Sequence, residues 1–87
     1  MRKIYHGILK TYFHHTLVRR RMDLQMTQSQ MAERLCMDDR SYIDLDHGTS
    51  CCSALTLALY LVFLCEDVRD FTEGLRYAFN TGKDSAA

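Results

Sequence analysis

The stretch that most constrains the fold is residues 27–48, TQSQMAERLCMDDRSYIDLDHG, where two short helical patterns lie about three residues apart. The hydroxyl of Thr27 can cap the first helix, and Gln30, three residues later, completes a capping box. Met31 and Leu35 then lie on one helix face, four residues apart. This part of the stretch therefore predicts a short helix that buries one face.

A second helix follows, with Asp38 as its N-cap and Tyr42 and Leu45 as its inward residues. Ala32 is small enough to let the second helix cross closely over the first, and Met37 can fill the angle between them. Two short helices that are joined by a turn and packed in this way are typical of a helix-turn-helix.

The same residues resemble the DNA-binding domain of the phage repressor/Cro (lambda repressor-like, XRE-type) regulators. The residues that keep the order and spacing of the family are Gln28, Ala32, Leu35, the Cys36–Met37 turn, Tyr42, Leu45, Asp46 and Gly48. The match covers 22 contiguous residues. It implies an all-α, compact five-helix domain with a central helix-turn-helix, which binds double-stranded DNA as a transcriptional regulator.

Two residues depart from the family pattern. Cys36 stands where the family usually has glycine, so a left-handed turn there would carry a steric cost of roughly 1 kcal/mol. Tyr42 replaces the usual β-branched aliphatic residue, so its hydroxyl needs a hydrogen-bond partner or access to water.

The resemblance implies that the second helix of the motif, about residues 39–47, enters the major groove as the recognition helix. The outward side chains that would lie there are Asp39, Arg40, Ser41, Ile43, Asp44 and His47. Arg40 can pair with guanine, and the two aspartates can accept hydrogen bonds from cytosine amino groups. The resemblance also implies that Gln28 contacts a phosphate or supports a reading side chain.

The charge of this region argues against DNA binding, because residues 38–48 carry four acidic side chains and one arginine, a net charge of −3. Acidic side chains repel the phosphates that supply much of the affinity for DNA. A second interpretation therefore stays open: a protein-interaction module with a helix-turn-helix fold, antitoxin-like or adaptor, with little or no DNA binding. Fold alone does not decide between the two functions.

Length and composition indicate a single domain, residues 1–87, with a modest core. Hydrophobic residues make up 47% and charged residues 25% of the chain, as in folded proteins, and the absence of proline favours helices. The net charge is zero, but it is unevenly distributed. Residues 1–37 hold seven basic and two acidic side chains, +5, whereas residues 38–87 hold four basic and nine acidic ones, −5.

A helix is expected over about residues 4–22, with an apolar stripe at Leu9, Phe13 and Leu17 and an N-terminal extension, about residues 1–12, beyond the usual family start. Its last turn holds three arginines. The resemblance favours a structural role for Arg21, with Asp46 as candidate partner, and a phosphate contact for Arg19 or Arg20. A solvated charged helix end is the alternative for the triplet.

The fourth helix should cover residues 54–64, ALTLALYLVFL, which are far fewer than the roughly 20 that span a bilayer. One side should cover the core, and the other should meet the fifth helix or a second subunit. The fifth helix should begin near residues 66–67 and end at Gly82, and residues 83–87 should fray. The surplus of large apolar residues predicts a homodimer through the fourth and fifth helices.

Other chemistry has little support in the sequence. The four cysteines form no CxxC pair, and cysteines and histidines show no spacing typical of zinc sites, so we expect reduced thiols and no metal. No nucleophile–base pair, phosphate-binding loop or cofactor motif indicates an enzyme, and no small-molecule ligand is evident. Without a signal peptide or membrane segment, a cytoplasmic protein is expected.

Overall fold

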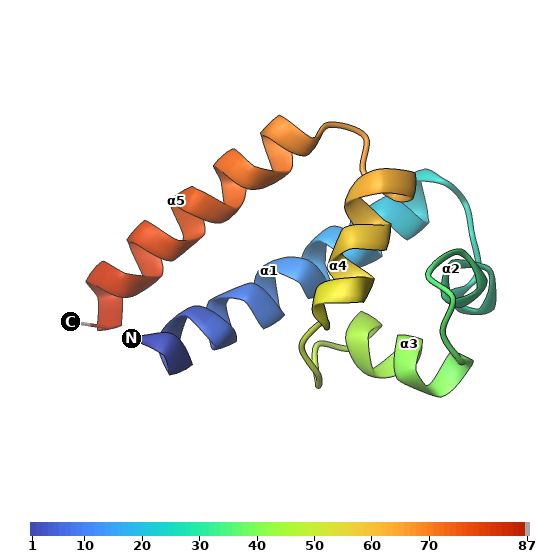
Figure 1. The fold of residues 1–87 in the computed structure, drawn as a ribbon, viewed down its shortest axis with the longest axis horizontal. Helices are drawn as coiled ribbons and strands as arrows, with labels where there is room; N and C mark the ends of the chain where they lie inside the picture. The colour runs from blue at the N-terminus through green and yellow to red at the C-terminus, as the bar shows by residue number, and fades with distance from the viewer. Residues whose placement is uncertain (87) are drawn as a thin grey trace.

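Five α-helices make up this computed structural model, which describes residues 1–86 (Figure 1). The helices are α1 (Arg2–Asp23), α2 (Gln28–Arg34), α3 (Asp39–Asp46), α4 (Ala54–Leu59) and α5 (Val68–Ala86), and a π-helical turn, η1 (Tyr60–Leu64), continues α4. No strand occurs in residues 1–86, which confirms the all-α fold class. Side chains are described for residues 1–82. None of the helices in the described part of the chain is both long and apolar enough to traverse a lipid bilayer.

The long helix α1 is central to the packing, because α3 and α5 both contact it (Figure 1). Phe13 and Leu17 of α1 are 1% and 0% exposed, and the Phe13 ring meets the Tyr60 ring edge-on at 5.3 Å between centroids. The other buried hydrophobic residues are Met31, Ala32, Leu35, Tyr42, Leu45, Leu64 and Phe71. The core therefore draws on α1, α2, α3, α5 and η1, and α4 adds the partly buried Leu57 and Leu59.

Helix α5 runs antiparallel to α1, so the start of α1 and the end of α5 lie side by side at one end of the molecule (Figure 1). The Tyr12 hydroxyl donates a hydrogen bond to the Phe71 carbonyl at 2.8 Å, and the Tyr5 and Phe79 rings meet edge-on at 5.0 Å. Burial, the largest cause, and the nearby Asp70 carboxylate raise the pKa of Tyr12. These contacts pack Phe71 and Phe79 of α5 against α1.

The prediction that Gly82 ends the fifth helix is wrong, because α5 continues to Ala86. Gly82 lies against α1, where an added Cβ would stand 2.5 Å from Ile8 Cδ1. The glycine therefore permits close helix packing and does not terminate the helix. Of the tail expected to fray, residues 83–86 are helical, and residue 87 lies outside the described residues.

The segment at residues 54–64 is helical as predicted, but α5 does not cover its outer side. Thr56, Tyr60 and Leu64 face the core, whereas Leu55, Val62 and Phe63 are exposed. Of the two neighbours expected for this side, the fifth helix does not cover it in the single chain, and a second subunit stays a prediction.

Candidate nucleic-acid interface

Both predicted caps of the α2–α3 unit are present. Thr27 Oγ1 accepts the backbone N–H of Gln30 at 3.1 Å, and Gln30 Oε1 accepts that of Thr27 at 2.8 Å, which completes the capping box. At α3, Asp38 Oδ1 accepts the backbone N–H of Ser41 at 2.6 Å. This hydrogen bond lowers the pKa of the Asp38 carboxyl. The starts of both helices are thus fixed by their own sequence.

The turn between α2 and α3 has the left-handed residue that the resemblance implies. Cys36 has a φ of +55°, and its N–H donates to the Glu33 carbonyl at 3.1 Å. The next N–H, of Met37, donates to the Ala32 carbonyl at 3.0 Å. Ala32 is 1% exposed, which agrees with its predicted place at the helix crossing.

Asp46, at the carboxyl end of α3, is the centre of a polar network that joins three helices. Arg21 of α1 donates from Nε to Oδ1 at 3.1 Å and from Nη2 to Oδ2 at 3.3 Å. Gln28 of α2 donates to Oδ2 at 3.0 Å, and the Tyr42 hydroxyl donates to Oδ1 at 3.1 Å. The predicted Arg21–Asp46 pair is therefore confirmed, and the Tyr42 hydroxyl has a partner.

The network also shifts the protonation of its members. Burial alone would raise the pKa of the Asp46 carboxyl, but the hydrogen bonds from Gln28, Arg21 and Tyr42 and the Arg21 charge outweigh burial and lower this pKa. Burial and the Asp46 carboxylate raise the pKa of Tyr42, and the hydrogen bond to Asp46 raises the pKa of Arg21. Asp46 is thus ionised at neutral pH, and Arg21 and Tyr42 stay protonated.

The outward side of α3 is open to solvent along its length. Asp39, Arg40, Ser41 and His47 are exposed, and Ile43 and Asp44 are partly exposed. Ser29 of α2 donates to Asp39 Oδ2 at 2.7 Å, which orients that carboxylate. Arg40 is 87% exposed, and its Nε lies 3.9 Å from Asp44 Oδ1. So long an exposed ion pair is weak, and Arg40 can turn towards a ligand.

Gln28 lies at the start of α2, where the resemblance places it, but its Nε2 is committed to Asp46. It therefore supports the carboxyl end of α3, and its amide nitrogen is not directed at the outward side chains. The sequence alone could not distinguish a phosphate contact from a supporting role for Gln28, because the difference depends on the direction of its side-chain amide.

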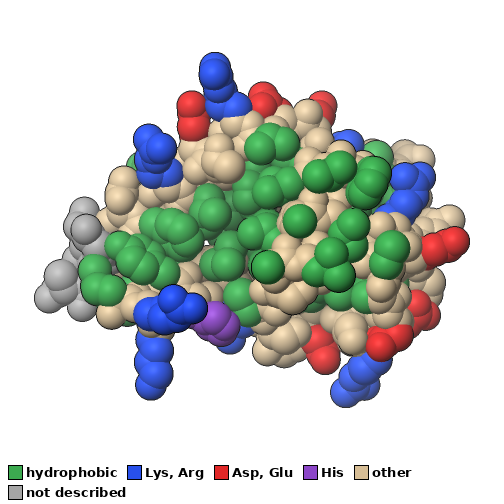
Figure 2. Space-filling view, viewed as in Figure 1, with side chains coloured by type: hydrophobic (Ala, Val, Ile, Leu, Met, Phe, Trp, Pro, Cys, Tyr) green, Lys and Arg blue, Asp and Glu red, His purple; other side chains and the backbone are tan. Residues whose placement is uncertain are grey.

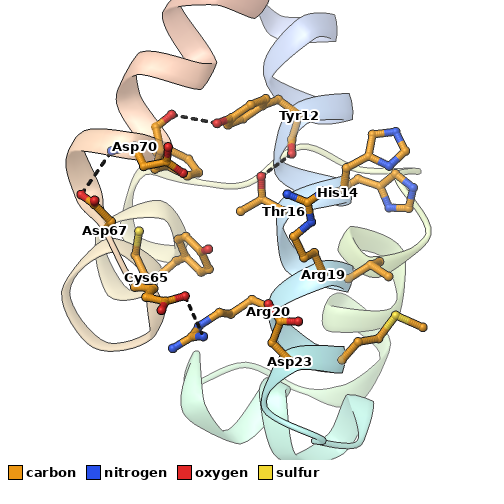
Figure 3. A pocket seen from close by; sticks show the side chains of 15 residues that line it. Tyr12, His14, Thr16, Arg19, Arg20, Asp23, Cys65, Asp67 and Asp70 are labelled. Carbon is orange, nitrogen blue, oxygen red and sulfur yellow. Dashed lines mark hydrogen bonds and ion pairs between the residues drawn. The ribbon is translucent and has the colours of Figure 1, made fainter.

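Arg19 and Arg20 line a hollow of about 1040 Å³ between α1 and the beginning of α5 (Figure 3). Arg20 Nε donates to the Leu64 carbonyl at 2.6 Å, and its Nη1 lies 3.7 Å from Glu66 Oε2. Arg20 thereby satisfies a free carbonyl at the end of η1. Arg19 is exposed, and no residue of α2 or α3 lines this hollow. The structure thus does not bring the two arginines together with the outward side of α3.

The described residues contain no group of three or more histidine, cysteine, aspartate or glutamate side chains that could hold a metal ion. The cysteines, Cys36, Cys51, Cys52 and Cys65, are all free thiols. Burial and the neighbouring Cys51 raise the pKa of Cys52 to about 11, so this thiol is protonated at neutral pH. The α2–α3 unit is therefore the candidate site, because caps fix the starts of its helices and most of its outward side chains are polar.

Comparisons of the chain with protein-family models, with curated proteins and with solved structures gave no match.

Proposed function

We propose that this chain binds double-stranded DNA in a sequence-specific manner and regulates transcription, with α3 in the major groove. The observation that carries the proposal is the Asp46 network, which holds the carboxyl end of α3 to α1 and α2 while its amino end stays exposed. In helix-turn-helix proteins the amino-terminal residues of the recognition helix contact the bases. The left-handed Cys36 and the resemblance to phage repressor/Cro regulators support the same function.

Arg40 is the side chain that would contribute most to base reading. It is the only arginine or lysine in α3, it stands one residue after the helix start, and it is 87% exposed. A guanidinium can donate two hydrogen bonds to guanine, worth about 1–3 kcal/mol of discrimination. Ser29 already orients the Asp39 carboxylate, so this carboxylate would accept a hydrogen bond from a cytosine amino group without a further loss of side-chain freedom.

The phosphate contacts need revision. Arg20 leaves the proposal because its guanidinium already binds the Leu64 carbonyl and lies near Glu66. Arg19 is exposed and stays as a candidate, although no residue of α3 lines the same hollow. With about one or two phosphate contacts, the logarithm of the binding constant should fall with a slope of only about −1 to −2 against the logarithm of salt concentration.

The test is binding of the chain to labelled fragments of its own promoter and of unrelated DNA across a salt series. We expect a preference for certain fragments that persists as salt rises, together with the shallow slope. Arg40→Ala should weaken binding to the preferred fragment about tenfold or more and relax the preference at one base pair. Arg69→Ala removes the same charge from an exposed position on α5 and is the matched control.

Equal binding of all fragments, or an Arg40→Ala variant that binds and selects as the wild type does, would overturn the proposal. The second candidate function is then a protein-interaction module. It is favoured by the net charge of −3 over residues 38–48, which suits a basic protein partner better than DNA.

A further inference from the structure

We propose that the outer side of α4 and η1 binds a second copy of this chain. We call this surface the α4–η1 face and define it by Leu55, Ala58, Leu59, Val62 and Phe63. The proposal does not depend on DNA binding, because it concerns a different surface from the outward side of α3.

The α4–η1 face exposes large apolar side chains on neighbouring helical turns. Leu55 is 66% exposed, Val62 71% and Phe63 68%. Single exposed apolar residues are common on monomers, but a contiguous group marks an interaction site. Figure 2 shows hydrophobic side chains continuing from α4 into the region between α1 and α5. The half-buried residues at that end of the surface are Tyr5, Leu75 and Phe79, which also line a shallow hollow.

The π turn sets the orientation of this segment. The Cys65 N–H donates to the Tyr60 carbonyl, five residues earlier, at 2.8 Å. Tyr60 and Leu64 at its two ends are buried, whereas the adjacent Val62 and Phe63 between them are exposed. The fold thus presents a bulky apolar pair to solvent at a position that is anchored to the core on both sides.

A second copy fits this face better than a charged partner does. No aspartate, glutamate, lysine or arginine occurs between Asp46 and Glu66. In a two-fold dimer the same patch meets its own copy, and an uncharged apolar patch complements itself without burying any charged group. A stable interface needs about 800 Å² from each partner. The continuation of the patch between α1 and α5 supplies area beyond the five residues of the face.

The test is the mass of the full chain, without DNA, by light scattering over the micromolar range. We expect a dimer. Val62→Glu and Phe63→Glu should each raise the dimer dissociation constant at least about tenfold, because a carboxylate would be buried against its own copy. Both positions are exposed in the single chain, so helical circular dichroism should stay unchanged. Tyr77→Glu is the matched control, since Tyr77 is 73% exposed on α5 and does not line the shallow hollow.

A monomer mass for the wild type throughout the range overturns the proposal. A dimer that both glutamate variants leave intact overturns it as well, since the interface would then lie elsewhere. Because no DNA is present, failure here leaves the proposed DNA binding standing, and a dimer that binds no DNA supports this inference alone.

Discussion

The carboxylate of Asp46 is 5% exposed, and four hydrogen bonds from three side chains meet its two oxygens. A buried charge is strongly unfavourable unless it is paired and hydrogen-bonded, so each donor contributes to keeping this carboxylate inside. Gln28 and Tyr42 are neutral, and Arg21 supplies the opposite charge. The network therefore acts as one unit, and removal of its centre should affect all three donors.

Asp46→Asn should destabilise the protein by about 3 kcal/mol, because the amide nitrogen cannot accept hydrogen bonds and Arg21 loses its ion pair. The midpoint of urea unfolding measures the loss. Asp39→Asn is the control, since Asp39 is exposed and its substitution should change stability by less than about 0.5 kcal/mol. Equal midpoints for the two variants would contradict the role given to the network.

The lowered pKa of Asp46 also predicts a pH dependence. A carboxyl with a lower pKa in the folded than in the unfolded state stabilises the fold above the unfolded pKa, about 3.9. This stabilisation is lost as the pH falls from that value through the folded pKa. Unfolding free energies measured from neutral to acidic pH should therefore fall less steeply at the acidic end in Asp46→Asn than in the wild type.

Cys36 has a φ of +55°, which costs a residue with a side chain roughly 1 kcal/mol relative to glycine. Cys36→Gly should therefore raise the free energy of unfolding by up to about 1 kcal/mol, although glycine also gains entropy in the unfolded chain. Cys36→Ala keeps the Cβ and should give no gain. Thermal unfolding of the two variants separates backbone strain from loss of the thiol, and equal midpoints would show that the turn is not strained.

At the scale of the helix, the α2–α3 unit depends on its inner face. Leu35 is 2% exposed and Leu45 is 4% exposed. Replacing either leucine with alanine should destabilise the fold by roughly 2–5 kcal/mol, since each substitution leaves a cavity in the core. Chemical denaturation measures both losses. Leu55→Ala, on the exposed side of α4, removes the same atoms and should cost much less in a monomeric sample.

Helix α3 also carries the charges that oppose DNA. Asp44→Asn removes one carboxylate from its outward side. The affinity for unrelated DNA at low salt should therefore rise by about as much as one phosphate contact contributes to the binding constant. Glu73→Gln, on the exposed side of α5, removes the same charge far from the proposed groove and should leave that affinity unchanged. Fluorescence anisotropy with a labelled duplex of random sequence compares the two variants.

The helices themselves could largely be predicted from the sequence, because their signals are local. Thr27, Gln30 and Asp38 cap helices through neighbours three residues away, and the apolar stripes mark the buried faces. The predicted helix end at Gly82 was wrong, because a glycine is also found where two helices pack closely together. Only the position of Ile8, on the other helix, distinguishes that use from a helix end.

At the scale of the molecule, the features that the sequence could not predict depend on contacts between residues far apart in the chain. The Arg21–Asp46 pair was predicted through the family resemblance. The partner of Arg20 lies 44 residues away, and the Ser29–Asp39 hydrogen bond depends on the angle between two helices. Whether α5 or solvent covers the outer side of α4 depends on the path of the whole chain. The periodicity of a sequence shows that one face of a helix is apolar, but it does not show which other element packs against that face.

The tie between the carboxyl end of α3 and two other helices has a consequence for motion. Helices α1, α2 and α3 share the Asp46 carboxylate, so opening α3 breaks its hydrogen bonds to both other helices, and opening α1 or α2 removes donors from the buried charge. The last turns of α5 rest on the first turns of α1, through Tyr5 and Ile8, and lie outside this network. In native-state hydrogen exchange the amides of α2 and α3 should therefore exchange with one common opening free energy. The amides near Phe79 should exchange sooner, as a separate and less stable cooperative unit.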